Sequence, residues 1–408
     1  MKKITILLLT ICFSQIIVAQ SRTLTNEQKE YLLKFIYSIK TFEPEEKNNE
    51  DLMIFDKFIG DARIVGLGES THGSSEIYKM KDRITRYLIN NKKFNVFSLE
   101  ANMPESYLMN NYIIENQGDP KEILKGMYFW IWKTQETLNL IEWMKINNQN
   151  NNSKAYFDGF DLQYQFGALK HIKEIYIKNN LNIEEYKNLV SILKNNNRGQ
   201  RSYKKKQQKI INELLKKIKE KVVNIQDNET KKRFLQNIRI IEQNIQVGSS
   251  EKRDEFMAEN IKWIYENYNN PKIIASAHNF HISKWSKVMM GNHLDKEFGE
   301  NYVNFGFAFY EGTYTGSLVK KPQTYNAQTA YEGTLEYHLN SLNIPIFILD
   351  LKSLKKENNK FFKDLFTSIL TRKTGSGISG DEFRKTNILD SFDYLIFINK
   401  STNSKLLN

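Results

Sequence analysis

Apolar and polar positions in the first third of the chain predict a strand, a helix and a second strand. Residues 62–67 and 94–99 are short, almost continuous apolar runs, which are typical of buried strands. Between them, apolar residues recur at helical spacing, at Ile77, Met80, Ile84 and Leu88. A strand–helix–strand unit of this kind pairs its strands in parallel, with a right-handed crossover.

Further apolar runs predict that strands and helices alternate along the whole chain. Strand patterns occur at residues 154–160, 272–277, 302–308, 344–349 and 394–399. A helical pattern near the N-terminus covers residues 31–39. We therefore expect an α/β fold with a central, mostly parallel sheet flanked by helices.

Residues 162–268 differ from the rest because their apolar positions follow only helical spacing. One amphipathic face includes Ile210, Leu214 and Ile218, and a second includes Leu235 and Ile238. We interpret this region as a helical insertion between two parts of one α/β domain, residues 21–161 and residues 269–408. It could act as a lid over the substrate cleft or be a purely structural helical hairpin.

The first twenty residues have the pattern of a signal peptide. Lys2 and Lys3 precede an apolar run over residues 4–17, and Ala19 supplies a small residue near its end. The alternative is a membrane anchor, but the run is shorter than the roughly 20 residues that a spanning helix needs. We expect residues 1–20 to be removed, the protein to be exported to the periplasm or secreted, and no stable membrane insertion afterwards.

Cysteine content and charge narrow the possible chemistry. The single cysteine, Cys12, lies in the predicted signal peptide, so the mature chain has no disulfide, thiol nucleophile or cysteine-ligated zinc. The net charge is +12, which can indicate binding to nucleic acids or anionic surfaces. However, the lysines cluster with asparagines on predicted helices, so we favour solvated surfaces and expect no nucleic-acid partner.

Titratable residues gather where the predicted strands end. Glu69 and His72 follow the first strand, Glu100 follows the second, and His278 and His281 follow the strand at 272–277. Carboxyl ends of parallel strands share one edge of a sheet, where catalytic residues of open α/β proteins lie. Each residue alone has a structural explanation, such as Glu69 next to a helix that begins at Ser74 or Ser75. The convergence of three of the six histidines with two glutamates predicts a catalytic centre.

The residue types favour hydrolysis by an activated water. A carboxylate can orient a histidine, which then removes a proton from water that attacks a carbonyl carbon. A second histidine or a cation can stabilise the resulting oxyanion. The chain has no Gly-x-Ser-x-Gly motif, which argues against an ordinary serine hydrolase. His278 and His281 with His72 could also form a divalent metal site, although no His-Glu-x-x-His motif is present.

Several sequence motifs together resemble the erythromycin esterase family. They are Arg-Ile-Val-Gly-Leu-Gly-Glu-Ser-Thr-His-Gly at 63–73, Phe-Ser-Leu-Glu-Ala at 97–101, Arg253-Asp254 with Met257 and Asn260, Ala-His-Asn-Phe-His at 277–281, and the ending at 392–397. The resemblance implies metal-independent hydrolysis of an ester or lactone without a cofactor. It also implies His72 as general base, with Glu69, Glu100 and His278 completing the centre and His281 nearby.

Two positions depart from the family's macrolide-resistance members. Residues 68–73 read Gly-Glu-Ser-Thr-His-Gly where those members often have Gly-Glu-Gly-Ala-His-Phe, which resembles a broader branch of the family. Lys81 stands where the family has an arginine. The positive charge is kept, but the planar guanidinium group, which can bind two oxygen atoms at once, is lost. We expect Lys81 to contribute to substrate binding or charge stabilisation.

Three functions therefore remain open. The leading hypothesis is an exported hydrolase for a macrolide-like lactone or another bulky small-molecule ester, with aromatic residues 128–130 and Trp132 lining the cleft. Those aromatic residues could equally belong to the core. The alternatives are a hydrolase or transferase for envelope polysaccharide esters, and a non-catalytic exported binding protein. Loss of turnover in a folded His72→Ala variant would distinguish an enzyme from a binding protein.

Overall fold

The computed structural model describes residues 23–193, 203–317, 321–377 and 380–407. The predicted signal peptide and Cys12 lie outside these residues. Within the described ranges, no helix is both long enough and apolar enough to cross a membrane.

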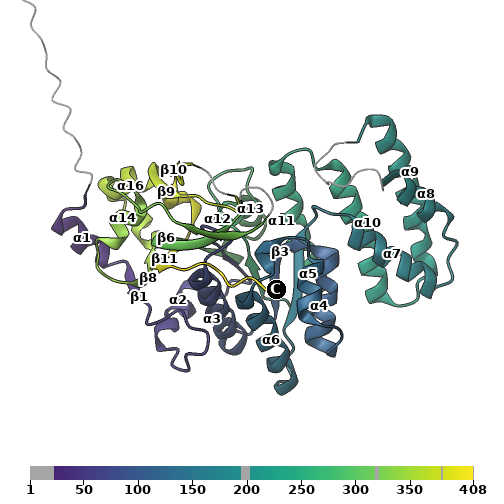
Figure 1. The fold of residues 1–408 in the computed structure, drawn as a ribbon, viewed down its shortest axis with the longest axis horizontal. Coiled ribbons are helices and arrows are strands. Elements are labelled where there is room, and N and C mark those ends of the chain that lie inside the picture. Colours follow the sequence, from purple (N-terminus) through teal and green to yellow (C-terminus); the bar gives the residue numbers. More distant parts are fainter. Residues whose placement is uncertain (1–22, 194–202, 318–320, 378–379, 408) are drawn as a thin grey trace, which may run out of the picture.

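A nine-stranded sheet forms the centre of the described structure, which confirms the predicted α/β fold (Figure 1). Its order is β1-β8-β11-β6-β2-β5-β3-β4, and β7 pairs with the far end of β6. The strands are β1 (Ile36–Ser38), β2 (Ile64–Leu67), β3 (Val96–Asn102), β4 (Tyr156–Asp161), β5 (Ile273–Ser276), β6 (Tyr302–Gly316), β7 (Gln323–Asn326), β8 (Ile346–Asp350) and β11 (Tyr394–Ser401). The strands from β11 to β4 pair in parallel, whereas β8 is antiparallel to both β11 and β1.

Both faces of the sheet are covered by apolar packing. Alternate strand residues point to opposite faces, so Ile64 and Ile273 join one buried cluster while Val65 and Ile274 join the other. All residues of β2 and β5 are buried. Burial on both faces explains why these strands are continuous apolar runs in the sequence.

Helices cover the sheet on both sides. Before the insertion they are α1 (Asn26–Leu33), η1 (Glu50–Leu52), α2 (Ile54–Ile59), α3 (Ser75–Lys92), α4 (Met103–Glu115), α5 (Pro120–Gly126), η2 (Trp130–Trp132) and α6 (Gln135–Asn150). Later helices are α12 (Asn279–Ile282), α13 (Met290–Phe298), η4 (Gly299–Asn301), α14 (Leu335–Asn340), α15 (Leu351–Lys356), α16 (Lys360–Thr367) and α17 (Ile388–Ser391). Ser74 caps α3 by accepting a hydrogen bond from the Ile77 amide, as predicted for one of the two serines.

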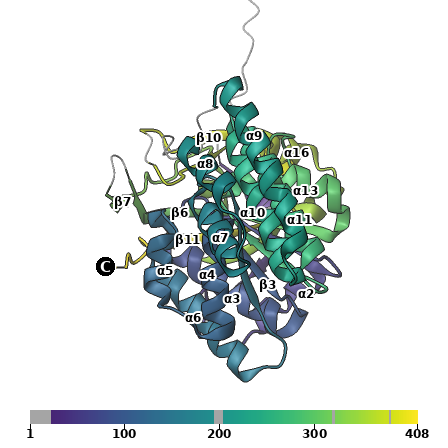
Figure 2. The same ribbon diagram turned by 90° about the vertical axis from the view of Figure 1, so that its right-hand side faces the viewer.

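The chain between β4 and β5 is helical throughout its described part. It contains α7 (Phe166–Lys178), α8 (Glu184–Leu193), α9 (Lys205–Glu220), η3 (Lys221–Asn224), α10 (Asn228–Gln246) and α11 (Ser250–Asn267). Figure 1 and Figure 2 show α7 to α10 grouped at one side of the sheet, with α11 between them and α13. Helix α11 packs on β4 and α13, so it returns the chain to the sheet. The role of this insertion as a lid stays a prediction.

Three local predictions were wrong or incomplete. The helix predicted over residues 31–39 ends at Leu33, and β1 follows because its backbone pairs with β8. Strand β6 continues to Gly316, well beyond residue 308, because its second half pairs with β7 and β11. The hairpin of β9 (Ile369–Arg372) and β10 (Phe383–Thr386) was not predicted.

Candidate active site

The loop between β2 and α3 carries Glu69 and His72 and is held by distant parts of the chain. The carbonyl of Gly73 accepts hydrogen bonds from the amides of Thr315 (2.9 Å) and Ser404 (2.8 Å). A Cβ atom on Gly73 would lie 1.9 Å from the Thr315 carbonyl oxygen, so only glycine fits this approach of β6. The loop is therefore clamped between β6 and the C-terminal segment.

The C-terminal segment, residues 402–407, joins the catalytic loop to the start of α6. The Ser75 amide donates to the Thr402 carbonyl over 2.9 Å, and the Thr402 hydroxyl donates to the Glu76 carboxylate over 2.6 Å. On the α6 side, the Gln135 amide donates to the Lys405 carbonyl over 2.7 Å. These contacts fix the beginning of α3 and therefore the loop before it.

Glu69 is fully buried and bonds to two partners. Its Oε1 lies 2.5 Å from Nδ1 of His72, and its Oε2 accepts from Nζ of Lys81 over 2.5 Å. Burial would raise the pKa of Glu69, but the Lys81 charge and the hydrogen bond from His72 lower it to about 2. The carboxylate is therefore ionised, and Nδ1 of His72 must carry the proton in this hydrogen bond.

Because Nδ1 is engaged by Glu69, Nε2 is the nitrogen of His72 that can exchange a proton with a bound molecule. His72 lines the main cavity of the site, and none of the described residues is a hydrogen-bond partner of its Nε2. Its ring meets Trp132 edge-on, with 6.2 Å between centroids. The Tyr78 hydroxyl donates to the His72 carbonyl over 2.9 Å. These contacts fix the imidazole in one orientation at the wall of the cavity.

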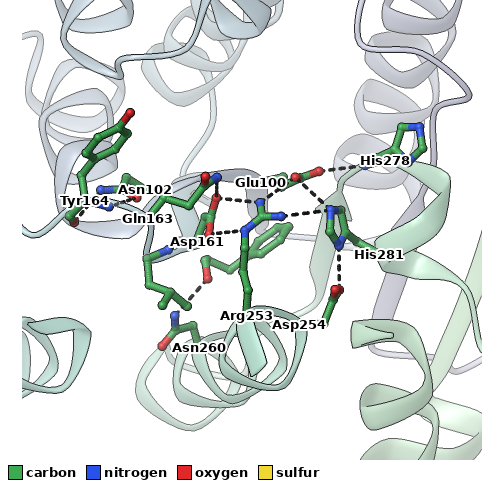
Figure 3. A network of polar contacts seen from close by, with 12 residues as sticks. Glu100, Asn102, Asp161, Gln163, Tyr164, Arg253, Asp254, Asn260, His278 and His281 are labelled. Carbon is green, nitrogen blue, oxygen red and sulfur yellow. Dashed lines mark hydrogen bonds and ion pairs between the residues drawn. The ribbon is translucent and has the colours of Figure 1, made fainter. Parts of the chain in front are cut away.

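Glu100 belongs to a second polar network, drawn in Figure 3, which starts at the ends of β3 and β4. Nη2 of Arg253 donates to Glu100 Oε1 and to Asp161 Oδ2, each over 2.8 Å. Nε of Arg253 donates to the other Asp161 oxygen over 3.0 Å. The other Glu100 oxygen accepts from the His278 amide over 2.9 Å. Although burial would raise the pKa of Glu100, His281 and Arg253 hold it well below its usual range.

His281 lies between two carboxylates. Its Nδ1 is 2.6 Å from Asp254 Oδ1, and its Nε2 is 3.2 Å from Glu100 Oε1. Burial opposes the charged form, but the charge of Glu100 and the hydrogen bond to Asp254 raise the pKa of His281 to about 9. At neutral pH it is an imidazolium, although Nη1 of Arg253 also lies 3.2 Å from its Nε2 and opposes this charge.

His278 has the opposite protonation state. It caps α12, and its Nδ1 accepts from the Phe280 amide over 3.2 Å. Burial, followed by the charges of His72 and His281, lowers its pKa to about 3. The neutral ring therefore carries its proton on Nε2, which lies 3.4 Å from the Thr374 carbonyl. The centroids of His278 and His72 are 5.2 Å apart.

These side chains surround a cavity of about 420 Å³. Its lining comprises His72, Glu100, Phe129, Trp130, Ile131, Gln163, Arg253, His278, Phe280, His281, Lys373, Gly375 and Ser376. The predicted residues His72, Glu100, His278 and His281 thus meet at one cavity, and Glu69 lies directly behind His72. Lys81 is not part of the lining, since its ammonium reaches Glu69 from the buried side.

Comparisons with known proteins show to which family the chain belongs. The family model described as erythromycin esterase matches residues 89–401, which is most of the chain, and starts after the Glu69–His72 loop. The chain belongs to the erythromycin esterase family.

Relatives of this erythromycin esterase family member include curated proteins and solved structures. It is 22% identical to YbfO of Bacillus subtilis, whose name describes a candidate hydrolase, over 87% of this chain and 89% of that protein. It is 24% identical to an Escherichia coli protein named erythromycin esterase type II, over 71% of this chain and 80% of that one.

Three solved structures share the fold. A Bacillus cereus protein has a TM-score of 0.81 at 25% identity, covering 94% of this chain and 99% of its own. A protein named as a succinoglycan biosynthesis protein has a TM-score of 0.79 at 26% identity, with coverage of 93% and 98%. An erythromycin esterase variant in its open conformation has a TM-score of 0.67 at 17% identity, with coverage of 90% and 97%. Family membership identifies the chain as a hydrolase.

In this family member, part of the site was not identified from the sequence. Asp161 was given no role in the site, and Arg253 and Asp254 were noticed only as part of a family motif. Lys373 follows β9 and lines the cavity, with its Nζ 5.3 Å from the centre of the Phe280 ring. The only local signal for Asp161 was that it directly follows the strand predicted at 154–160.

The predicted aromatic lining is partly present. Phe129 and Trp130 line the cavity, whereas Trp132 is fully buried beside His72. Tyr128 is partly exposed and donates its hydroxyl to Glu105 over 2.7 Å. In the part of the chain that the structure describes, no group of three or more histidine, cysteine or acidic side chains is arranged to hold a metal ion.

Proposed function

We propose that this chain is an exported carboxylic-ester or lactone hydrolase in which His72 activates a water molecule. The observation that carries the proposal is the Glu69–His72 hydrogen bond of 2.5 Å, which fixes the Nδ1–H tautomer and leaves Nε2 free at the cavity. An ordered imidazole with one free nitrogen beside a buried, ionised carboxylate is suited to general-base catalysis.

In the proposed reaction, Nε2 of His72 takes a proton from water while the water oxygen attacks the ester carbonyl carbon. The negative charge of the buried Glu69 stabilises the imidazolium that forms. Collapse of the tetrahedral intermediate breaks the bond to the alkoxide oxygen, and the imidazolium returns its proton to that oxygen. The products are a carboxylic acid and an alcohol, or one hydroxy acid from a lactone.

His278 is the proposed donor to the oxyanion. It is neutral at working pH, and the 3.4 Å contact of its Nε2–H with Thr374 is a weak hydrogen bond that a developing oxyanion can replace. His281 is less suited to this task because Asp254 occupies its Nδ1, and Glu100 and Arg253 both contact its Nε2. Its proposed role, together with Arg253, is to hold Glu100 and thereby the His278 backbone.

The first candidate substrate is a macrolide-like lactone. Incubation of the mature protein with erythromycin, with and without a chelator, would be followed by mass spectrometry. The proposal predicts a product heavier by one water, formed in both conditions and absent with His72→Ala. Loss of product only with the chelator would instead require a metal, and product formation by His72→Ala would contradict the role of His72.

A second candidate is an ester substituent of an extracellular polysaccharide, and one comparison favours it. The relative named as a succinoglycan biosynthesis protein is 26% identical over 93% of this chain. Release of acetate from an acetylated polysaccharide, without turnover of erythromycin, would select this substrate.

Export is also a proposal. It predicts that protein recovered outside the cytoplasm begins near Ser21, which N-terminal sequencing would test; an intact Met1 start in that fraction would contradict it. If the chain is a non-catalytic binding protein, the His72→Ala and Glu69→Gln variants should keep their ligand affinity. If it is an enzyme, both variants should lose turnover, and His72→Ala should remain folded.

A further inference from the structure

A cluster of aromatic side chains lies beside the catalytic cavity and has no part in the proposed proton transfers. This aromatic platform consists of Tyr128, Phe129, Tyr164 and Phe166. Ring centroids are 4.4 Å apart for Tyr128 and Tyr164, 5.7 Å for Phe129 and Tyr164, and 6.2 Å for Tyr164 and Phe166. Tyr128 and Phe166 keep 37% and 38% of their surface exposed. Grouped, exposed aromatic rings are a feature of binding surfaces.

The platform is continuous with the cavity. Phe129 belongs to both, and Gln163, which precedes Tyr164, also lines the cavity. Figure 3 shows Tyr164 and Asn102 at one end of the polar network and His278 at the other. A substrate whose ester lies near His72 can therefore extend past Phe129 onto the platform.

Two buried polar side chains hold the platform in place. Asn102 pins the backbone of Tyr164, since its Oδ1 accepts from the amide (3.1 Å) and its Nδ2 donates to the carbonyl (2.7 Å). Glu105 accepts from the Tyr128 hydroxyl (2.7 Å), the Gly167 amide (2.8 Å) and Asn102 (3.0 Å). Asn102 ends the strand that carries Glu100, so the platform is fixed relative to the catalytic centre.

Tyr128 adopts a strained backbone conformation. Its φ angle is +65°, and the Phe129 amide donates to the Met127 carbonyl over 2.8 Å, which closes a γ-turn around Tyr128. A non-glycine residue in this region is strained and persists only where the surroundings impose it. Here the hydrogen bond to buried Glu105 imposes it and presents the ring beside Tyr164.

We propose that the platform seats a sugar ring, so that the substrate is an ester carried by, or linked to, a pyranose. This proposal rests on the hydrolase function proposed above. Aromatic faces attract the C–H face of a pyranose, and the open, half-exposed platform leaves the hydroxyl edge of the sugar hydrated. Gln163 and the Tyr164 side chain add polar groups at the border with the cavity. An acyl chain would instead favour an enclosed apolar pocket.

Two acetate esters of a primary alcohol on a six-membered ring test the proposal: methyl 6-O-acetyl-β-glucopyranoside and cyclohexylmethyl acetate. Phe166→Ala and Tyr164→Ala should each raise KM for the sugar ester about tenfold, with kcat unchanged within about twofold. The KM for the cyclohexyl ester should change much less. Ile177→Ala is the matched control, since Ile177 is an exposed apolar residue (62%) further along the same helix as Phe166. Equal losses for both esters would identify a general apolar subsite and overturn the proposal, as would unchanged KM values.

A binding measurement separates this proposal from the hydrolase function. Saturation-transfer NMR with methyl β-glucopyranoside needs no turnover and can use the His72→Ala protein. Transfer to the sugar that disappears in His72→Ala/Phe166→Ala would support the platform even if no ester is hydrolysed. Absence of transfer in His72→Ala would overturn it even if esters are hydrolysed. Turnover of erythromycin or of an acetylated polysaccharide would then show which source supplies the sugar.

Discussion

Lys81 and Glu69 form an ion pair of 2.5 Å in which both side chains are almost completely buried. One carboxylate oxygen of Glu69 holds Lys81, and the other holds His72. The cavity lining does not include Lys81. Its effect on catalysis is therefore expected to act through Glu69, which makes it a positioning residue.

Glu69→Gln should reduce both activity and stability. The amide cannot stabilise a His72 imidazolium, and it leaves the Lys81 ammonium buried without a counter-charge. We expect kcat to fall at least about a hundredfold and the free energy of unfolding to fall by roughly 3 kcal/mol. Steady-state kinetics and urea unfolding measure the two effects.

The double variant Glu69→Gln/Lys81→Met separates the proposed catalytic role of Glu69 from its contribution to stability. Removing both charges should restore most of the stability lost in Glu69→Gln, because no unpaired charge remains buried. Activity should stay low. Recovery of activity together with stability would show that Glu69 serves only the fold.

His72→Ala should abolish hydrolysis with little loss of stability. General-base catalysis contributes roughly 10²–10⁴ in rate, and His72 lies at the cavity wall rather than in an apolar core. Thermal unfolding should shift by only a few degrees. His293→Ala, on α13 and outside the cavity lining, is the matched control and should retain full activity. An unfolded His72→Ala protein would make His72 a structural residue.

The pKa of His281 predicts a loss of stability in alkali. Its pKa is raised to about 9 in the folded chain from its ordinary 6.5, so the folded state holds the proton more tightly. The resulting contribution, roughly 3 kcal/mol, is fully present below pH 6.5 and is lost as pH rises through about 9. Urea midpoints between pH 6 and 10 should fall more steeply for the wild type than for His281→Gln. Parallel curves would show that His281 is not charged in the folded protein.

Arg253→Lys should lower activity although the charge is kept. The guanidinium contacts Glu100 on β3 and both oxygens of Asp161 on β4, which one ammonium cannot do. We expect kcat/KM to fall about 10- to 100-fold. Arg239→Lys provides the control, since Arg239 makes a bidentate pair with Glu259 on the surface of the insertion. Equal effects of the two changes would indicate a general loss of helix packing.

The sequence was most informative where apolar runs are buried on both faces of the sheet. Strands β2 and β5 lie within the predicted runs for that reason. The edge of the sheet was harder to predict: Ile36 and Ile39 fit a helical pattern, but pairing with β8 makes this segment a strand. Such pairing depends on residues more than 300 positions away, which no local pattern records.

The candidate site was also predicted only in part from the sequence. Glu69, His72, His278 and His281 follow strands that end at one edge, and Glu100 lies near the end of β3, so the sheet topology brings all five together. Arg253 reaches this edge from the first turn of helix α11, and an arginine on a helix is usually a surface residue. Its importance depends on Asp161, 92 positions away, which became visible only in three dimensions.

The covering of the Glu69–His72 loop by residues 402–407 sets an order of events during synthesis. The loop is made early, whereas Thr402 and Ser404, which bond to Ser75 and Gly73, are made more than 300 residues later. A chain interrupted before Thr402 lacks these partners and cannot finish the loop. If the proposed function holds, hydrolytic activity should therefore begin only after translation has passed this segment.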